Sequence, residues 1–153
     1  MKIRLIAVGK IREAYVAAAL VDFRARLRHY YTYEEVEVAA AHGADPSRAM
    51  REDGQRVLKV LEAGDVLWLL ERDGTELSSV ELAQHLRALA DGGTQRLVLA
   101  IAGAYGASEE LVARADLRWS LSRLTFLHEW ARALVVEQLY RAAKIARNEP
   151  YHH

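Results

Sequence analysis

Short apolar runs rich in Val, Leu and Ile alternate along this chain with longer stretches of helical periodicity. This alternation predicts an α/β fold with a mainly parallel sheet flanked by helices, because parallel strands need long crossover segments between them. The expected strands are 2–8, 34–40, 66–70, 96–102 and 117–121. The expected helices are 11–29, 46–62, 78–90, a short one opening at Ser108, and 128–148.

Local signals support several of these boundaries. Valine alternates with glutamate in 34–40, which indicates a half-exposed strand near an edge of the sheet. The Asp-Pro pair at 45–46 is a helix-start signal, and Ser78 with Glu81 has the spacing of a capping box. The segment 71–74 (Glu-Arg-Asp-Gly) is interpreted as a turn that ends the third strand.

Composition limits the class of protein and the chemistry available to it. The 153 residues show no repeat or linker, so one domain, 1–153, is expected. The absence of cysteine excludes disulfides and thiolate sites, and the six histidines lack metal-ligand spacing, so no metal is expected. No apolar stretch has the length of a signal sequence or a membrane span, so we expect a cytoplasmic protein with no membrane partner.

Three loops, 70–74, 102–106 and 121–127, are expected at the carboxyl edge of the sheet, where parallel α/β proteins bind small molecules. Gly103 and Gly106 allow the backbone to approach a ligand closely. A lone G-x-x-G is equally typical of an ordinary strand-to-helix turn, so both interpretations stay open. The loop lacks a full dinucleotide fingerprint and a Walker lysine, so phosphate binding there is not expected.

Hydroxyl side chains gather directly before the final helix, at Ser120, Ser122 and Thr125. They are suited to hold the edge of an adenine while the apolar side chains between them cover its faces. Capping of the helix is the simpler interpretation, and the two are compatible.

The apolar arc of the final helix, 128–148, spans about half of its circumference. One flank is expected to face the core and the other a second subunit, so a homodimer through this helix is predicted. Gln138 lies inside the arc and Arg132 at its margin, and each is expected to be paired across an interface or directed at a site. The alternative for Arg132 is that its guanidinium reaches water along the aliphatic stem.

Several motifs resemble those of one enzyme family. They are Val-Gly-Lys at 8–10, Glu-x-x-Gly at 71–74 with Ser78-Ser79, Ile-x-Gly-x-x-Gly at 101–106, Ser-Leu-Ser-Arg-Leu-Thr-Phe-x-His at 120–128, Arg132, Glu-Gln-x-Tyr-Arg-Ala at 137–142, Ile145 and Pro-Tyr-His at 150–152. In these motifs, which extend over the full length, the chain resembles the RlmH family of SPOUT-class enzymes. That family methylates N3 of a pseudouridine in large-subunit ribosomal RNA.

The resemblance implies a C-terminal trefoil knot that binds S-adenosylmethionine, a topology that chain-packing rules alone do not predict. It implies cofactor contacts at Leu70, Ala102, Gly103, Leu121, Ser122, Arg123, Leu124, Thr125 and Phe126. These positions fall on the three loops already expected at the carboxyl edge. It also implies ribosomal RNA, on the assembled ribosome, as substrate and partner.

Two positions depart from the family pattern. Ala102 stands where the family usually has the first of two glycines, and Leu127 stands where a proline usually precedes the histidine. The extra methyl of Ala102 is harmless if φ is negative there, and Leu127 leaves the loop less rigid. Neither change removes a chemical group, so cofactor binding is expected to persist.

Methyl transfer to N3 of a pseudouridine requires that this nitrogen lose its proton. A base within hydrogen-bond reach and a cation beside the developing anion are therefore expected. Catalytic roles are predicted for Arg132, His128, Tyr151 and His152, with Arg141 and His153 as further candidates. The terminal segment 151–153 is expected to pack against the partner subunit, where His152 acts as a base or a phosphate contact.

Two alternatives remain open at this level. The first is a SPOUT methyltransferase acting on another RNA, such as transfer RNA. The second is a non-enzymatic dimeric RNA-binding module without cofactor affinity, for which Ala102 is the clue.

Overall fold

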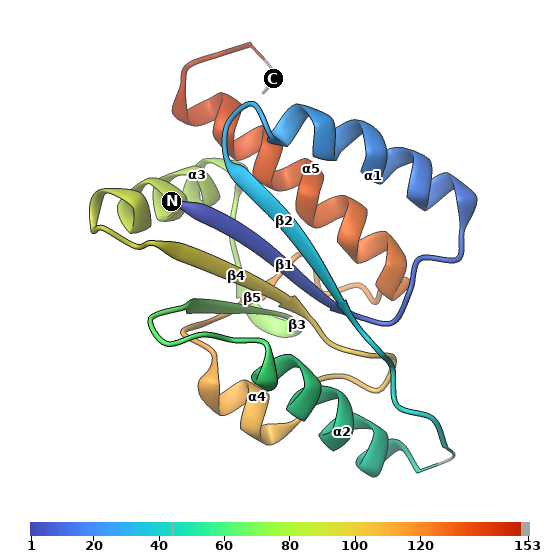
Figure 1. Cartoon of the computed structure of the whole chain (residues 1–153). Coiled ribbons are helices and arrows are strands. Elements are labelled where there is room, and N and C mark those ends of the chain that lie inside the picture. The colour runs from blue at the N-terminus through green and yellow to red at the C-terminus, as the bar shows by residue number, and fades with distance from the viewer. Residues whose placement is uncertain (44, 151–153) are drawn as a thin grey trace.

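The computed structural model describes residues 1–43 and 45–150, and its elements alternate as the sequence predicts (Figure 1). Five strands form one parallel sheet in the order β2-β1-β4-β3-β5. The strands are β1 (Lys2–Val8), β2 (Thr32–Val38), β3 (Val66–Glu76), β4 (Arg96–Ile101) and β5 (Leu117–Ser120). The helices are α1 (Ala14–Leu27), α2 (Pro46–Lys59), α3 (Ser79–Asp91), α4 (Glu109–Arg114) and α5 (His128–Ala146).

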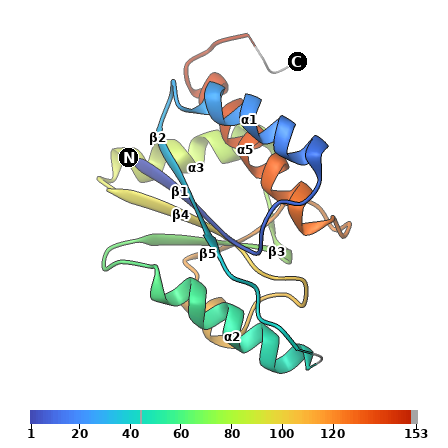
Figure 2. The ribbon, with the colours of Figure 1, turned by 45° about the vertical axis from the view of Figure 1, so that its right-hand side comes forward.

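Helices cover both faces of the sheet. Figure 2 shows α1, α3 and α5 on one face and α2 on the other, where α4 also packs. Side chains of β1 divide accordingly: Ile3 and Leu5 join the core of the first layer, and Ile6 and Val8 join that of the second. Because both faces are buried, β1 and β4 each contain a continuous apolar run, 5–8 and 97–101, instead of alternating with polar residues there.

The predicted start signals of α2 and α3 are confirmed. The Asp45 side chain accepts a hydrogen bond from the backbone of Ser47 at the start of α2. Ser78 and Glu81 form the reciprocal capping box at the start of α3. The strand predicted at an edge is β2, which does lie at the edge of the sheet.

The turn predicted at 71–74 is wrong, because β3 continues through these residues to Glu76. Its pairing with β5 shifts register between Leu70 and Thr75, so the irregularity lies inside the strand. A Cβ at Gly74 would lie 2.5 Å from the carbonyl oxygen of Arg118. The glycine therefore allows two strand backbones to approach, and it does not reverse the chain.

The width of the apolar arc on α5 has an explanation within one chain. This helix packs against both α1 and α3, so two flanks are covered without a second subunit. Gln138, expected to need a partner across an interface or at a site, accepts a hydrogen bond from Ser79 Oγ of α3 at 3.1 Å. Strand order does not establish the trefoil knot, which stays a prediction. In the described residues, no helix combines the length and hydropathy needed to cross a membrane.

Candidate active site

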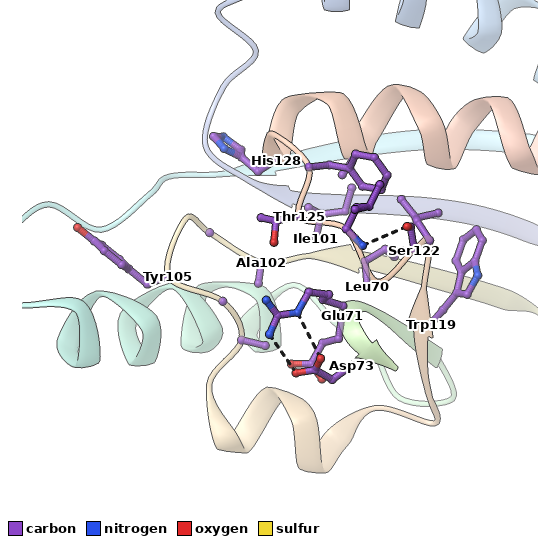
Figure 3. Close-up of a pocket in the computed structure, with 18 residues that line it drawn as sticks. Leu70, Glu71, Asp73, Ile101, Ala102, Tyr105, Trp119, Ser122, Thr125 and His128 are labelled. Carbon is purple, nitrogen blue, oxygen red and sulfur yellow. Dashed lines mark hydrogen bonds and ion pairs between the residues drawn. The ribbon is translucent and has the colours of Figure 1, made fainter. Parts of the chain in front are cut away.

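A pocket of about 470 Å³ opens at the carboxyl edge of the sheet (Figure 3). It lies where β3, β4 and β5 end and α5 begins, so the three loops predicted to meet at this edge do meet. Its volume falls within the range of roughly 300–1,000 Å³ that is usual for small-molecule sites. The lining residues are Leu70, Glu71, Arg72, Asp73, Ile101, Ala102, Gly103, Tyr105, Gly106, Ala107, Trp119, Leu121, Ser122, Leu124, Thr125, Phe126, His128 and Ala131.

The pocket combines apolar walls with a few polar groups. Leu70, Ile101 and Trp119 supply apolar surface from the three strand ends. The hydroxyl of Thr125 has no hydrogen-bond partner among the residues described and stays available to a ligand. Apolar walls with isolated polar groups are suited to a flat heterocycle whose edges carry donors and acceptors.

The hydroxyls before α5 do not cap this helix, so that part of the interpretation is wrong. The N-cap residue is Leu127, which makes no side-chain capping bond. Ser122 Oγ accepts a hydrogen bond from the backbone of Leu124 at 3.1 Å and so shapes the loop (Figure 3). Ser120 is buried and donates to the carbonyl of Arg72 at 2.8 Å, which joins the β5 end to β3.

The glycine loop is closed on itself and supported from behind. The Gly106 amide donates to the Gly103 carbonyl at 3.0 Å, and Gly106 has a φ of +92°, which favours glycine. A Cβ on Gly103 would lie 2.4 Å from Asp53 Oδ2 of α2. Asp53 is buried and accepts a hydrogen bond from the Ala41 amide at 2.7 Å, so its position is fixed. Helix α2 thus supports the glycine loop from the face of the sheet opposite to α5 (Figure 2).

The structure brings the predicted cofactor positions together with one exception. Arg123 is exposed and does not line the pocket, whereas the other eight predicted residues do. Ala102 does not have a positive φ, so its methyl causes no backbone strain. Leu127 has a φ of −56°, within the range that proline fixes, so the departure there keeps a proline-like backbone. The Tyr105 ring is turned away from the centre of the pocket (Figure 3).

The predicted catalytic residues do not all gather at the pocket. His128 lines it at the first turn of α5. Arg132 is only 1% exposed, so the alternative that it reaches water is wrong, and it is absent from the lining. Arg141 lies further along α5, where it pairs with Glu137 at 2.9 Å. The positions predicted in the C-terminal segment, Tyr151, His152 and His153, lie outside the described residues.

The guanidinium of Arg132 is bound by groups at the ends of two strands. It donates to Glu37 Oε1 of β2 at 2.8 Å, to the Val8 carbonyl of β1 at 3.3 Å and to the Gly9 carbonyl. Its Nε has no partner among the described residues. The predicted contact of Arg132 with substrate has no support in this arrangement.

Sequence reasoning missed a charged wall of the pocket. Glu71 and Asp73 line it from β3 (Figure 3). Each is neutralised by an arginine: Arg118 bonds Glu71 at 2.6 Å, and Arg72 lies 3.3 Å from Asp73. The turn interpretation of 71–74 hid these side chains, which belong to β3 at its register shift between Leu70 and Thr75. Among residues 1–43 and 45–150, no group of three or more His, Asp or Glu side chains is arranged to hold a metal ion.

Comparison with known proteins assigns the chain to a family. The family model described as "Predicted SPOUT methyltransferase" matches residues 1–152. The chain belongs to the SPOUT methyltransferase family. It is 40% identical over 153 residues to a protein of Geotalea daltonii named "Ribosomal RNA large subunit methyltransferase H", with 100% of both chains covered. A protein of the same name from Pelobacter propionicus is 42% identical over 153 residues, again with 100% of both covered.

A solved structure shares the fold of this chain. It is described as "The structure of a probable methylase family protein from Haemophilus influenzae Rd KW20", and its TM-score with this chain is 0.55. The match covers 95% of this chain and 66% of that chain at 13% identity, so it bears on the fold alone.

In this SPOUT methyltransferase a buried carboxylate joins the loop after β1 to the start of α5. Glu129 Oε2 accepts hydrogen bonds from the backbone amides of Arg12, at 2.9 Å, and Glu13, at 3.0 Å. These two amides, first that of Glu13 and then that of Arg12, hold the pKa of Glu129 below its usual value. The contact fixes the residues that precede α1 beside the pocket residue His128.

The lowered pKa of Glu129 gives an expected pH dependence. A carboxylate with a lowered folded pKa adds stability at neutral pH, and this contribution is lost as the pH falls through that pKa. The glutamine variant, Glu129→Gln, keeps an acceptor without the charge. The unfolding free energy of wild type should therefore exceed that of the variant near pH 7, and the difference should shrink below about pH 4.3. Urea unfolding at several pH values measures it, and a difference independent of pH would contradict the charged contact.

Proposed function

We propose that this chain transfers the methyl group of S-adenosylmethionine to N3 of a pseudouridine in 23S ribosomal RNA. The observation that carries the proposal is the pocket, in which eight of the nine residues implied as cofactor contacts meet from three separate loops. The names of the full-length relatives from Geotalea daltonii and Pelobacter propionicus support ribosomal RNA as the substrate. In this proposal the chain forms one domain spanning 1–153. It acts in the cytoplasm on the assembled ribosome.

The pocket fits the proposed cofactor in size and chemistry. Its volume of about 470 Å³ and its apolar walls at Leu70, Ile101 and Trp119 suit an adenosyl group, and the free Thr125 hydroxyl offers a polar contact. When bound, S-adenosylmethionine supplies a methyl carbon attached to a positively charged sulfur. The loops that contribute Gly103 and Leu121–Phe126 align that carbon and exclude water, which is the main task in a direct displacement.

The proton on N3 requires a base near the mouth of the pocket. His128 is the predicted catalytic residue that the pocket does contain, and a neutral imidazole nitrogen can accept a proton. We assign it the role of accepting the N3 proton or of contacting the nucleotide that carries it. Arg132 is not assigned such a contact in this proposal, because its guanidinium donates to Glu37 and to the Gly9 carbonyl.

The C-terminal residues Tyr151 and His152 keep their proposed catalytic role. Deleting 151–153 should lower methyl transfer at least about tenfold, by analogy with the loss of a general acid or base. The S-adenosylmethionine dissociation constant and the unfolding midpoint should stay unchanged, because the deletion keeps every pocket-lining residue of the described chain. Single-turnover methylation, calorimetric titration and thermal unfolding measure these three quantities. Unchanged turnover would refute a role for the tail.

A homodimer through α5 also remains part of the proposal. Trp130 of α5 and Tyr15 of α1 pack edge to face, with ring centroids 5.7 Å apart, yet they are 40% and 56% exposed. Leu127 beside them is 51% exposed. Large apolar side chains gathered at one end of a helix pair favour a partner subunit over solvent.

The test is to incubate the protein with isotopically labelled S-adenosylmethionine and either 70S ribosomes or transfer RNA. We expect label in 23S ribosomal RNA, at a pseudouridine identified by mass spectrometry of nuclease fragments. Label in transfer RNA alone would replace the substrate in this proposal, and no binding of S-adenosylmethionine would favour a non-enzymatic RNA-binding module.

A further inference from the structure

Three exposed cations lie on the loops at the carboxyl edge of the sheet. Lys10 and Arg12 follow β1, and Arg123 lies between pocket residues of the loop before α5. None of the three has a carboxylate partner within the described chain. Most other lysines and arginines form ion pairs, as Arg96 does with Asp65 at 2.6 Å.

Two backbone hydrogen bonds hold the loop that carries Lys10 and Arg12 beside the pocket. The Arg12 amide donates to Glu129 Oε2 at 2.9 Å, which fixes the loop after β1 against the first turn of α5 (Figure 1). His128, the residue before Glu129, lines the pocket. Arg123 belongs to the segment that leads into this turn, so both loops flank the α5 side of the opening.

The charge on this side of the pocket differs from that on the β3 side. On β3, the acids Glu71 and Asp73 are neutralised by Arg118 and Arg72. On the α5 side, Glu13 is the acid adjacent to Arg12, and it is exposed without an ion-pair partner. Buried Glu129, which accepts from the Arg12 amide, is the second acid on this side. Three exposed cations against these two acids leave a local positive charge on a chain whose formal net charge is zero.

We propose that Lys10, Arg12 and Arg123, here called the basic rim, bind phosphates of the RNA substrate on the α5 side of the pocket. The inference rests on the proposed function and adds to it the surface along which the RNA strand lies. The cations are spread over two loops and do not converge on one cavity, which suits an extended polyanion better than a single phosphate. The proposal also assigns Arg123 to the RNA substrate instead of the cofactor, in keeping with the absence of Arg123 from the pocket lining.

The test compares wild type with the double variant Lys10→Ala/Arg12→Ala and with Arg123→Ala. Affinity for 70S ribosomes is measured between about 50 and 200 mM salt, since each lost phosphate contact should reduce the log–log salt slope by about 0.7–0.9. We expect the double variant to bind roughly tenfold more weakly near physiological salt, with a raised KM and a smaller salt slope. The dissociation constant for S-adenosylmethionine should stay unchanged in both variants.

A matched control is Lys59→Ala. Lys59 is exposed, has no carboxylate partner in the described structure, and ends α2 at the opposite edge of the sheet. This variant should bind ribosomes as wild type does. A salt slope in the double variant equal to that of wild type would overturn the basic rim, and so would an equal effect of Lys59→Ala. If wild type binds ribosomes but transfers no methyl group, the proposed function fails, while the salt slopes still decide the binding surface.

Discussion

Replacing Arg132 by methionine is expected to lower the free energy of unfolding by about 2–4 kcal/mol. The buried guanidinium donates to Glu37 Oε1 at 2.8 Å and to the carbonyls of Val8 and Gly9. Methionine fills most of the volume but leaves these three acceptors without their donor. Glu37 is 41% exposed and regains water, so the two carbonyls at the end of β1 account for much of the loss.

Chemical unfolding measures this loss, and Arg26→Met is the matched control. Arg26 is exposed and pairs with Asp22 one helical turn away, at 2.9 Å, so its replacement should lower the stability far less than that of Arg132. A folded Arg132→Met protein of wild-type stability that had lost only methyl transfer would contradict this account. That result would return Arg132 to the catalytic role first predicted for it.

Replacing Gly103 by alanine is expected to weaken S-adenosylmethionine binding at least about tenfold and to lower the unfolding free energy by about 1–3 kcal/mol. The new Cβ would lie 2.4 Å from Asp53 Oδ2 and 3.3 Å from Val8 Cγ1. Asp53 is buried and bonded to the Ala41 amide, so the glycine loop has to move instead. That movement displaces the loop into the pocket.

A double-mutant cycle separates this collision from other effects of the alanine. Asp53→Ala removes the carboxylate, so Gly103→Ala should cost less in the Asp53→Ala background than in wild type. Calorimetric titration with S-adenosylmethionine and thermal unfolding give both free energies. Additive effects would show that Asp53 does not set the position of Gly103.

Signals in local sequence predicted the elements of this fold well. The capping box of Ser78 and Glu81 and the Asp-Pro start of α2 depend on neighbouring residues only, and both form as expected. The three pocket loops were predictable because parallel strands place their carboxyl ends at one edge.

Features set by contacts between distant segments were not predictable in the same way. The sequence Glu-Arg-Asp-Gly at 71–74 has turn composition, yet it lies inside β3 as an irregularity, because Leu70 and Thr75 on either side of it both pair with Trp119 of β5. Arg132 in an apolar arc indicates burial, but its partners, Glu37 and the end of β1, are more than 90 residues away. The arc of α5 likewise gave no indication that α1 and α3 together cover it.

Amide hydrogen exchange with and without S-adenosylmethionine tests the central claim, that three strand-end loops form the cofactor site, most directly. We expect added protection in 70–74, 102–107 and 121–127 and no change in α2 beyond the residues that contact Gly103. Protection elsewhere, with these three loops exchanging at the same rate as before, would contradict the site.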